Sequence, residues 1–274
     1  MAQTLVLGPL TLPFSLLLAL AVMVLAPMAG QLVARRLGTD LESLLFRVMV
    51  TGFVVARLVY VVRYSDSYLQ SPLDILDIRD GGWAPWAGVA AAAVVALYVG
   101  LRRAPLRKPL AVSFGTAALI WFVGSMALDA LTQPQDRLPA SSLRGLGGET
   151  VALGSFAGKP TVVNLWATWC PPCRREMPVL QEAQASRPDV NFVFLNQGES
   201  PEKVRAFLAA QQWPLRNVLL DTRGEVAKQL GVRGLPTTLF YDANGRLVDA
   251  RVGELSRATL AQRLGAPRLE HQSP

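Results

Sequence analysis

Residues 166–173 read Trp-Ala-Thr-Trp-Cys-Pro-Pro-Cys and contain both cysteines of the 274-residue chain. They follow an apolar, β-branched run at residues 161–166, which predicts a buried strand. The residues after them have mostly helical composition. Pro171 and Pro172 suit a first helical turn, because the amide hydrogens they lack would have no intrahelical partner there. Cys170 is therefore expected where a strand ends and a helix begins.

A thiol at a helix N-terminus faces unpaired N–H groups and the positive end of the helix dipole, which favour the thiolate. The thiolate is the reactive form in disulfide exchange, so this position predicts redox chemistry. A structural disulfide is a poor alternative because so short a loop gains little stability when it closes. Zinc needs about four ligands, and the chain has two cysteines and one histidine. We expect neither a metal nor a cofactor.

Three separated motifs carry a resemblance to a known family. They occupy residues 163–178 around the two cysteines, then Asn196-Gln-Gly-Glu-Ser200, then Gly234-Leu-Pro-Thr-Thr238. In this order they resemble the TlpA/ResA-like membrane-tethered thiol–disulfide oxidoreductases of the thioredoxin superfamily. The resemblance covers about the last half of the chain and implies an α/β thioredoxin-like fold there.

The resemblance, with the helical position, implies the catalytic roles. Cys170, at the exposed helix start, would attack, and Cys173, one turn further, would close a redox-active disulfide with it. Glu176 follows Cys173 by three residues, so it returns to the same helix face. The family carries an acidic group there, which could move a proton during exchange. The alternative is a solvated surface glutamate. Asn164 stands where ordinary thioredoxins place a buried aspartate, and this departure favours the role of Glu176.

The third motif looks like the cis-proline loop of the family. The resemblance implies that Pro236 is cis and that the backbone of Leu235 binds an extended substrate, whereas an ordinary trans turn proline is the alternative. Trp169 is expected to be partly exposed and to bind substrate, and Trp166 to lie in the core. Glu199 could also approach the site.

The first half of the chain has a different composition. The chain is 51% hydrophobic and only 17% charged, with a net charge of +7, but its first half has no basic run interleaved with aromatics, which argues against nucleic-acid binding. Four apolar segments occupy about residues 1–34, 44–62, 81–101 and 109–128. Each is long enough to cross a membrane, and four buried core helices in succession would be a poor alternative.

The loops between these segments differ in charge, which predicts orientation. The second loop balances its arginines with four aspartates, whereas the first and third are basic, with Arg35, Arg36, Arg102, Arg103, Arg107 and Lys108. The positive-inside rule places the basic loops in the cytoplasm. We therefore expect a multi-pass protein of the bacterial inner membrane, with the N-terminus and the thiol domain outside the cytoplasm.

A second resemblance lies in the membrane part. Ala56-Arg-Leu-Val-Tyr-Val61, Pro72 and Gly81-Gly82 look like the front part of prolipoprotein diacylglyceryl transferase. The histidine position of that family is held by Trp86, and its later spans are missing. We therefore expect a degenerate module that anchors the chain. Arg57, well inside the second segment, should pair with an acidic group or extend to the interface.

These observations predict an all-α transmembrane region of four helices at 1–132, a linker at 133–149, a thioredoxin-like domain at 150–266 and a disordered tail at 267–274. Alternating strands and helices with a terminal hairpin predict a mixed sheet flanked by helices.

The resemblance also implies partners. They are client proteins whose disulfides are reduced, for example in cytochrome c or copper-site assembly. Because the four spans contain no cysteine, the electrons should come from a separate membrane donor of the DsbD/CcdA type. Two other hypotheses stay open: lipid-linked transfer with an accessory thioredoxin-like domain, and a non-catalytic docking module or holdase.

Overall fold

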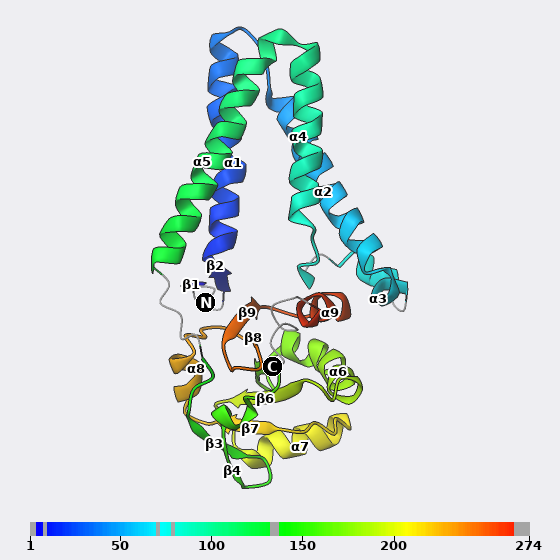
Figure 1. Cartoon of the computed structure of the whole chain (residues 1–274), viewed down its shortest axis with the longest axis vertical. Coiled ribbons are helices and arrows are strands. Elements are labelled where there is room, and N and C mark those ends of the chain that lie inside the picture. Colours follow the sequence, from blue (N-terminus) through cyan, green and yellow to red (C-terminus); the bar gives the residue numbers. More distant parts are fainter. Residues whose placement is uncertain (1–3, 8–9, 70–71, 78–79, 132–136, 266–274) are drawn as a thin grey trace. The chain divides into compact units, whose positions relative to one another are not determined.

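The computed structural model describes residues 4–7, 10–69, 72–77, 80–131 and 137–265. The chain forms two compact units, whose helices and strands are labelled in Figure 1. They are residues 12–78 with 82–132, and residues 133–274 with 1–11 and 79–81. The predicted tail at 267–274 and the start of the predicted linker lie outside the described residues.

The first unit is helical. Its helices are α1 (Phe14–Arg36), α2 (Glu42–Arg63), α3 (Ser65–Leu69), α4 (Pro85–Arg102) and α5 (Arg107–Leu131), with 3-10 turns η1 (Pro72–Ile75) and η3 (Ala104–Leu106). Helix α1 packs mainly on α5, and α2 packs mainly on α4. Within the described residues, four helices are long and apolar enough to cross a membrane, as the sequence predicts. The first apolar segment is not helical from its start, since β1 (Thr4–Leu7) pairs with β2 (Leu10–Pro13) before α1 begins.

Small residues bring α2 and α4 together. A Cβ atom added to Gly88 would lie 2.7 Å from the carbonyl oxygen of Gly52. The two helix backbones approach this closely only because neither residue has a side chain, which is the usual way in which transmembrane helices pack.

Arg57 of α2 is buried, and its guanidinium donates to the carbonyls of Ile75 (3.1 Å), Asp77 (3.1 Å) and Gly82 (2.7 Å). The rings of Tyr68 and Trp83 also face it. These contacts hold the segment between α2 and α4 and compensate for the desolvation of the cation.

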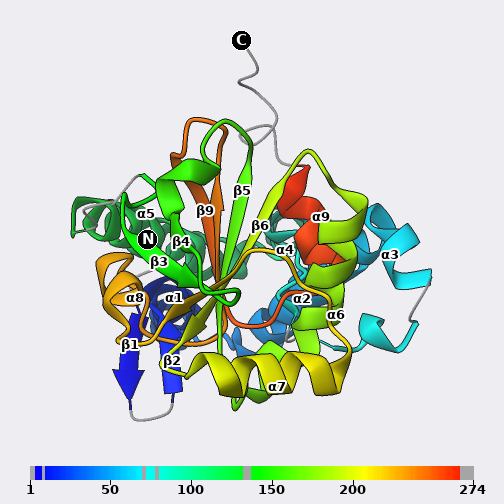
Figure 2. The ribbon, with the colours of Figure 1, turned by 90° about the horizontal axis from the view of Figure 1, so that it is seen from below.

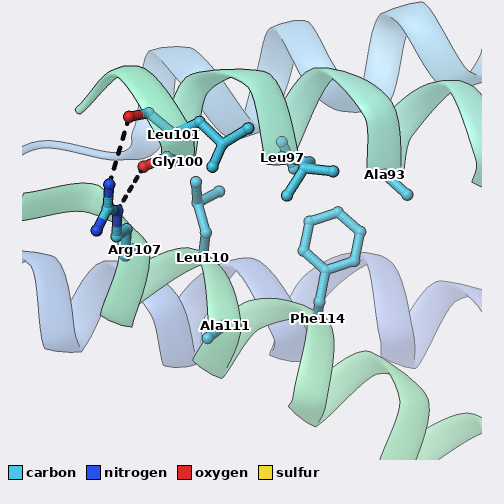
Figure 3. A pocket seen from close by; sticks show the side chains of 9 residues that line it. Ala93, Leu97, Gly100, Leu101, Arg107, Leu110, Ala111 and Phe114 are labelled. Atoms are coloured by element: carbon cyan, nitrogen blue, oxygen red, sulfur yellow. Dashed lines mark hydrogen bonds between the residues drawn. The ribbon is translucent and has the colours of Figure 1, made fainter. Parts of the chain in front are cut away.

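A second arginine, Arg107 of α5, forms hydrogen bonds with the end of α4. Arg107 donates to the carbonyls of Gly100 (2.8 Å) and Leu101 (3.4 Å), which lack intrahelical partners (Figure 3). An apolar hollow of about 350 Å³ lies beside it and is lined by Leu97, Leu110 and Phe114 among others.

The second unit contains a seven-stranded sheet in the order β4-β3-β7-β6-β5-β8-β9. Its strands are β3 (Ser142–Gly145), β4 (Thr150–Ala152), β5 (Thr161–Trp166), β6 (Asn191–Gln197), β7 (Val218–Asp221), β8 (Thr237–Tyr241) and β9 (Leu247–Val252). Strands β5, β6 and β7 are parallel, and the other pairs are antiparallel. The predicted mixed sheet is confirmed.

Helices cover both faces of this sheet (Figure 2). They are α6 (Pro171–Ser186), α7 (Pro201–Gln211), α8 (Glu225–Gln229) and α9 (Arg257–Leu264), with a 3-10 turn η4 (Leu153–Phe156). Because side chains alternate along a strand, Phe192 and Phe194 of β6 pack with α6, α7 and α9, whereas Val193 packs on the other face with α8. The core thus fixes both ends of β5 and the start of α6.

Strand β3 lies within the stretch that the sequence predicts as a linker. It pairs with β4 through Leu143 and Val151, and with β7 through Arg144 and Leu220. The sheet therefore begins before residue 150, where the sequence places its first strand.

Candidate active site

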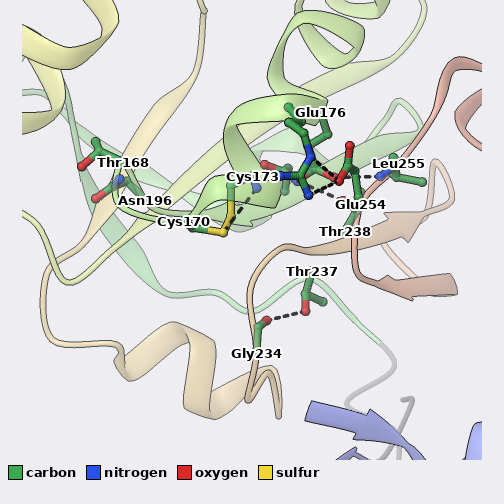
Figure 4. Close-up of a disulfide and its surroundings, with 12 residues drawn as sticks. Thr168, Cys170, Cys173, Glu176, Asn196, Gly234, Thr237, Thr238, Glu254 and Leu255 are labelled. Carbon is green, nitrogen blue, oxygen red and sulfur yellow. Dashed lines mark hydrogen bonds and ion pairs between the residues drawn. A yellow bond between two sulfur atoms is a disulfide. The ribbon is translucent and has the colours of Figure 1, made fainter. Parts of the chain in front are cut away.

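The two cysteines lie at the junction of β5 and α6. Cys170 is the N-cap residue of α6, and Pro171 begins the helix, as the sequence predicts. The N–H of Cys170 donates to the carbonyl of Ala167 at 3.2 Å, which closes a tight turn over residues 167–170. Cys170 and Cys173 form a disulfide, and the N–H of Cys173 donates to Sγ of Cys170 at 3.3 Å (Figure 4). The backbone thus presents one N–H, that of Cys173, to the sulfur of Cys170. Cys170 is only 3% exposed, whereas the sequence places it at an exposed helix start. The catalytic roles of the two cysteines stay predictions.

Glu176 is fully buried beside this disulfide-bearing turn of α6. Its Oε1 accepts from Nδ2 of Asn164 at 2.7 Å, and its Oε2 accepts from the N–H of Leu255 at 2.9 Å (Figure 4). Burial raises the pKa of Glu176 to about 8, although both hydrogen bonds act to lower it. The alternative of a solvated surface glutamate is wrong. A carboxyl that titrates near neutral pH can accept or donate a proton, and this role of Glu176 stays a prediction.

Asn164 connects Glu176 to the neighbouring strand β8. Its Nδ2 also donates to Oγ1 of Thr238 at 2.9 Å, and its Oδ1 finds no hydrogen-bond partner within the described part of the chain. This orphaned acceptor lies on the same amide that contacts Glu176. A rotation of the amide would let Oδ1 accept from a protonated Glu176.

The predicted proline loop lies at the same end of the sheet. The Leu235–Pro236 peptide bond is cis. Leu165 of β5 pairs with Thr237 of β8, so the residue before Thr237 lies beside the end of β5, where the turn with the cysteines begins. Leu235 is partly buried and packs against core residues on both faces of the sheet.

The two tryptophans of the motif lie in different environments. Trp166 is fully buried, whereas Trp169 is 64% exposed. Among the side chains that the structure describes from residue 137 onward, Trp169 is the one large apolar side chain that is exposed. This exposure agrees with the prediction, and its role in substrate binding stays a prediction.

Glu199 also contacts the turn, because it accepts from the backbone N–H of Thr168 at 2.7 Å. Sequence reasoning brought Glu199 near the site only through the motif at 196–200. The contact itself joins residues 31 positions apart, and no local spacing predicts it.

Comparison with known families divides the chain in the same way as its sequence. The Redoxin family matches residues 133–264, and the prolipoprotein diacylglyceryl transferase family matches residues 5–127.

Individual relatives cover somewhat less than half of this chain. The thioredoxin-like protein YneN of Bacillus subtilis is 34% identical over 137 residues, which are 48% of this chain and 79% of that protein. The thiol-disulfide oxidoreductase ResA of Bacillus thuringiensis is 33% identical over 43% of this chain and 69% of that protein. A solved structure of a thioredoxin-family thiol:disulfide interchange protein from Chlorobium tepidum is 28% identical, covers 49% of this chain and 99% of that one, and superposes with a TM-score of 0.43. The chain therefore belongs to the ResA-like thiol–disulfide oxidoreductases of the thioredoxin superfamily, with an N-terminal region that matches the prolipoprotein diacylglyceryl transferase family.

Proposed function

We propose that this protein is a membrane-tethered, extracytoplasmic oxidoreductase that reduces disulfides of client proteins. The observation that carries the proposal is the Cys170–Cys173 pair at the start of α6, next to the buried carboxyl of Glu176. A dithiol at a helix N-terminus with a proton-carrying group beside it suits thiol–disulfide exchange.

The reaction has two exchange steps. The thiolate of Cys170 attacks one sulfur of the client disulfide, forms a mixed disulfide and releases the other client sulfur as a thiolate. Cys173 then loses its proton and attacks Sγ of Cys170, which closes the intramolecular disulfide seen here and releases the second client thiolate. The client gains two electrons and two protons, and the dithiol of this protein loses them.

Glu176 would serve the second step. A carboxyl with a pKa of about 8 can accept the proton of Cys173 when that thiol attacks, and can return it when the disulfide is reduced again. Asn164, which donates to Oε1 of Glu176 at 2.7 Å, holds the carboxyl in place.

Trp169, Leu235 and Pro236 would bind the client around its cysteine. The exposed ring of Trp169 offers apolar area beside Cys170. The backbone of Leu235 borders the same end of the sheet, where an extended segment could pair with it.

The four apolar helices would anchor this domain with the basic loops in the cytoplasm and the dithiol outside. In an oxidising compartment the disulfide must be reduced again after each cycle. No cysteine lies in the spans, so we propose a separate membrane thiol donor of the DsbD/CcdA type. Clients in cytochrome c or copper-site assembly fit such a reductant.

The test is capture of the client in cells. A Cys173→Ala protein should hold its client on Cys170 as a mixed disulfide that a reductant releases. The matched control, Cys170→Ser with Cys173→Ala, should capture nothing. Trapping of free thiols should find Cys170 and Cys173 reduced at steady state and oxidised when the donor is deleted. A pair that is fully oxidised, and unchanged when the donor is deleted, would contradict a reductase.

A second candidate function follows from the match of residues 5–127 to prolipoprotein diacylglyceryl transferase. In that reading the membrane unit modifies lipoproteins or docks partners, and the thioredoxin-like domain is an accessory. An Arg57→Gln protein would then lose lipoprotein modification in cells that depend on this chain. Under our proposal no modification depends on it. Full function of a Cys170→Ser protein in cells would instead support a docking module.

A further inference from the structure

The buried carboxylate of Glu199 binds the turn at residues 167–170, which ends at Cys170. Oε2 of Glu199 accepts from the backbone N–H of Thr168 at 2.7 Å, and Oε1 accepts from Oγ1 of Thr168 at 2.6 Å. Thr168 is the second residue of the turn that the N–H of Cys170 closes onto Ala167. The carboxylate therefore binds both the backbone and the side chain of the turn.

Glu199 has two further hydrogen-bond partners, and both lie outside the turn. Nδ2 of Asn196, at the end of β6, donates to Oε2 at 2.9 Å. Nζ of Lys203, on the first turns of α7, lies 2.8 Å from Oε1. Each carboxylate oxygen thus has two donors, and Glu199 is only 5% exposed.

The charged form of Glu199 is the one that this environment supports. Burial acts to raise the pKa of Glu199, but the hydrogen bonds from Lys203, Thr168 and Asn196 outweigh burial and lower it. An amide could not replace the carboxylate, because its nitrogen would face donors.

Lys203 supplies the only positive charge among these partners, and its side chain is 57% exposed. Without it, Glu199 would place a negative charge that only neutral donors balance on Thr168, two positions before Cys170. A negative charge near a thiol disfavours the thiolate.

We propose that Glu199 is a positioning residue of the redox site, which fixes the turn that presents Trp169 and Cys170, and that Lys203 is the counter-ion that keeps its charge from opposing the thiolate. The inference rests on the proposed role of Cys170 as the attacking thiol. It adds residues of β6 and α7 to a site otherwise built from β5, α6 and β8.

The experiment uses the full chain in detergent and two readouts. The first is the rate at which a maleimide alkylates Cys170 as a function of pH, in a Cys173→Ala background where it is the sole thiol. The second is kcat/KM for reduction of a disulfide-bonded peptide by the protein with both cysteines. The variants are Glu199→Gln, Lys203→Met and the double variant. Lys228→Met, which removes an exposed lysine of α8, is the control.

The two readouts should separate the two roles. Lys203→Met should move the midpoint of the alkylation profile to higher pH, so that Cys170 reacts about three- to tenfold more slowly at neutral pH, because one pKa unit is a tenfold change in thiolate population. Glu199→Gln, which leaves the ammonium of Lys203 without its anion, should not raise this midpoint but should lower kcat/KM about tenfold, as expected for a misplaced reacting group. The double variant should recover the midpoint and not kcat/KM.

Thr168→Val gives a milder test, since it removes only the hydroxyl contact and keeps the backbone one. It should lower kcat/KM by a few-fold while the protein stays folded. If all these variants behave like Lys228→Met in both readouts, the inference is wrong. If wild-type Cys170 itself alkylates like a thiol in an unstructured peptide, the proposed function fails instead.

Discussion

Replacement of Glu176 by glutamine should change how stability depends on pH. Glu176 is fully buried and its pKa is raised from 4.5 to about 8. The folded protein therefore binds its proton more tightly than the unfolded chain does. The stabilisation by this group is complete below the unfolded pKa and is lost as the pH rises through the folded pKa. From pH 5 to pH 9 the free energy of unfolding should fall by about 4 kcal/mol through this group alone.

Glutamine has nearly the same shape and does not titrate. In Glu176→Gln one of the two donors, Asn164 or the N–H of Leu255, would face the new amide nitrogen. Rotation of the Asn164 amide can offer its unpartnered Oδ1 instead. The variant should therefore lose about 1 kcal/mol at pH 5. At pH 9, where the wild-type protein buries a charge, the variant should be more stable by about 3 kcal/mol.

The two stability curves should thus cross between pH 5 and pH 9. The assay is pulse proteolysis in urea on the full chain in detergent, which cleaves the unfolded fraction of the thioredoxin-like unit. The protein is kept oxidised, so that no thiol titrates with the carboxyl. Glu182→Gln is the matched control, since Glu182 lies on the same helix but is exposed and pairs with Arg257. A difference between wild-type and Glu176→Gln that stays constant over this pH range would refute the reasoning.

Three further predictions concern single contacts. Asn164→Asp would place a second carboxyl against Glu176, so the pair should share one proton and the variant should be about 3 kcal/mol less stable at pH 9 in the same assay. Trp169→Ala should change stability by less than about 0.5 kcal/mol because the ring is exposed; it should raise KM for a disulfide-bonded peptide about tenfold and leave the alkylation rate of Cys170 unchanged. Arg57→Lys should destabilise the helical unit by about 3 kcal/mol, because lysine cannot donate to three carbonyls from a planar fork. Thermal unfolding of the detergent-solubilised chain measures this loss, and alkylation of Cys170 should not follow it.

Much of the second unit could be predicted because the local sequence indicates its elements clearly. The run at 161–166 is mostly apolar and rich in β-branched residues, and it forms β5 over these residues. Helix α9 begins after Ser256, whose side chain accepts from the N–H of Thr259 in a capping box. In both cases local chemistry and burial favour the same element.

Strand β3 could not be predicted in the same way. Ser142-Leu-Arg-Gly145 is short and largely polar, with only Leu143 and Gly145 buried. It is a strand because β4 and β7 pair with it on both sides, and such tertiary pairing leaves little local signal. At the charge-free start of the chain, by contrast, the local sequence predicts too much. Its apolar residues suggest one long span, but the helix begins only at Phe14.

The candidate site likewise combines a contact that local spacing predicts with contacts that depend on the tertiary fold. Helical spacing brings Glu176 back to the face of Cys173, so its proximity could be predicted, although its burial depends on β8 and on the backbone of Leu255. The contact of Glu199 with Thr168 depends on the crossover from β6 to α7, which brings together residues distant in sequence.

Two buried carboxyl groups lie near the cysteine turn, and their surroundings shift their pKa values in opposite directions. Glu176 receives hydrogen bonds from two neutral donors, and burial outweighs them and the charge of Arg251, so its pKa rises to about 8 and it can exchange a proton near neutral pH. Glu199 receives four donors, one of them the ammonium of Lys203, so it stays ionised. Only a group that titrates in the working pH range can carry a proton between steps, and only a group that does not titrate there can hold a loop with constant strength. The environments of these two residues therefore assign proton transfer to Glu176 and positioning to Glu199. Because both residues are glutamates, their surroundings, and not their side chains, determine these roles.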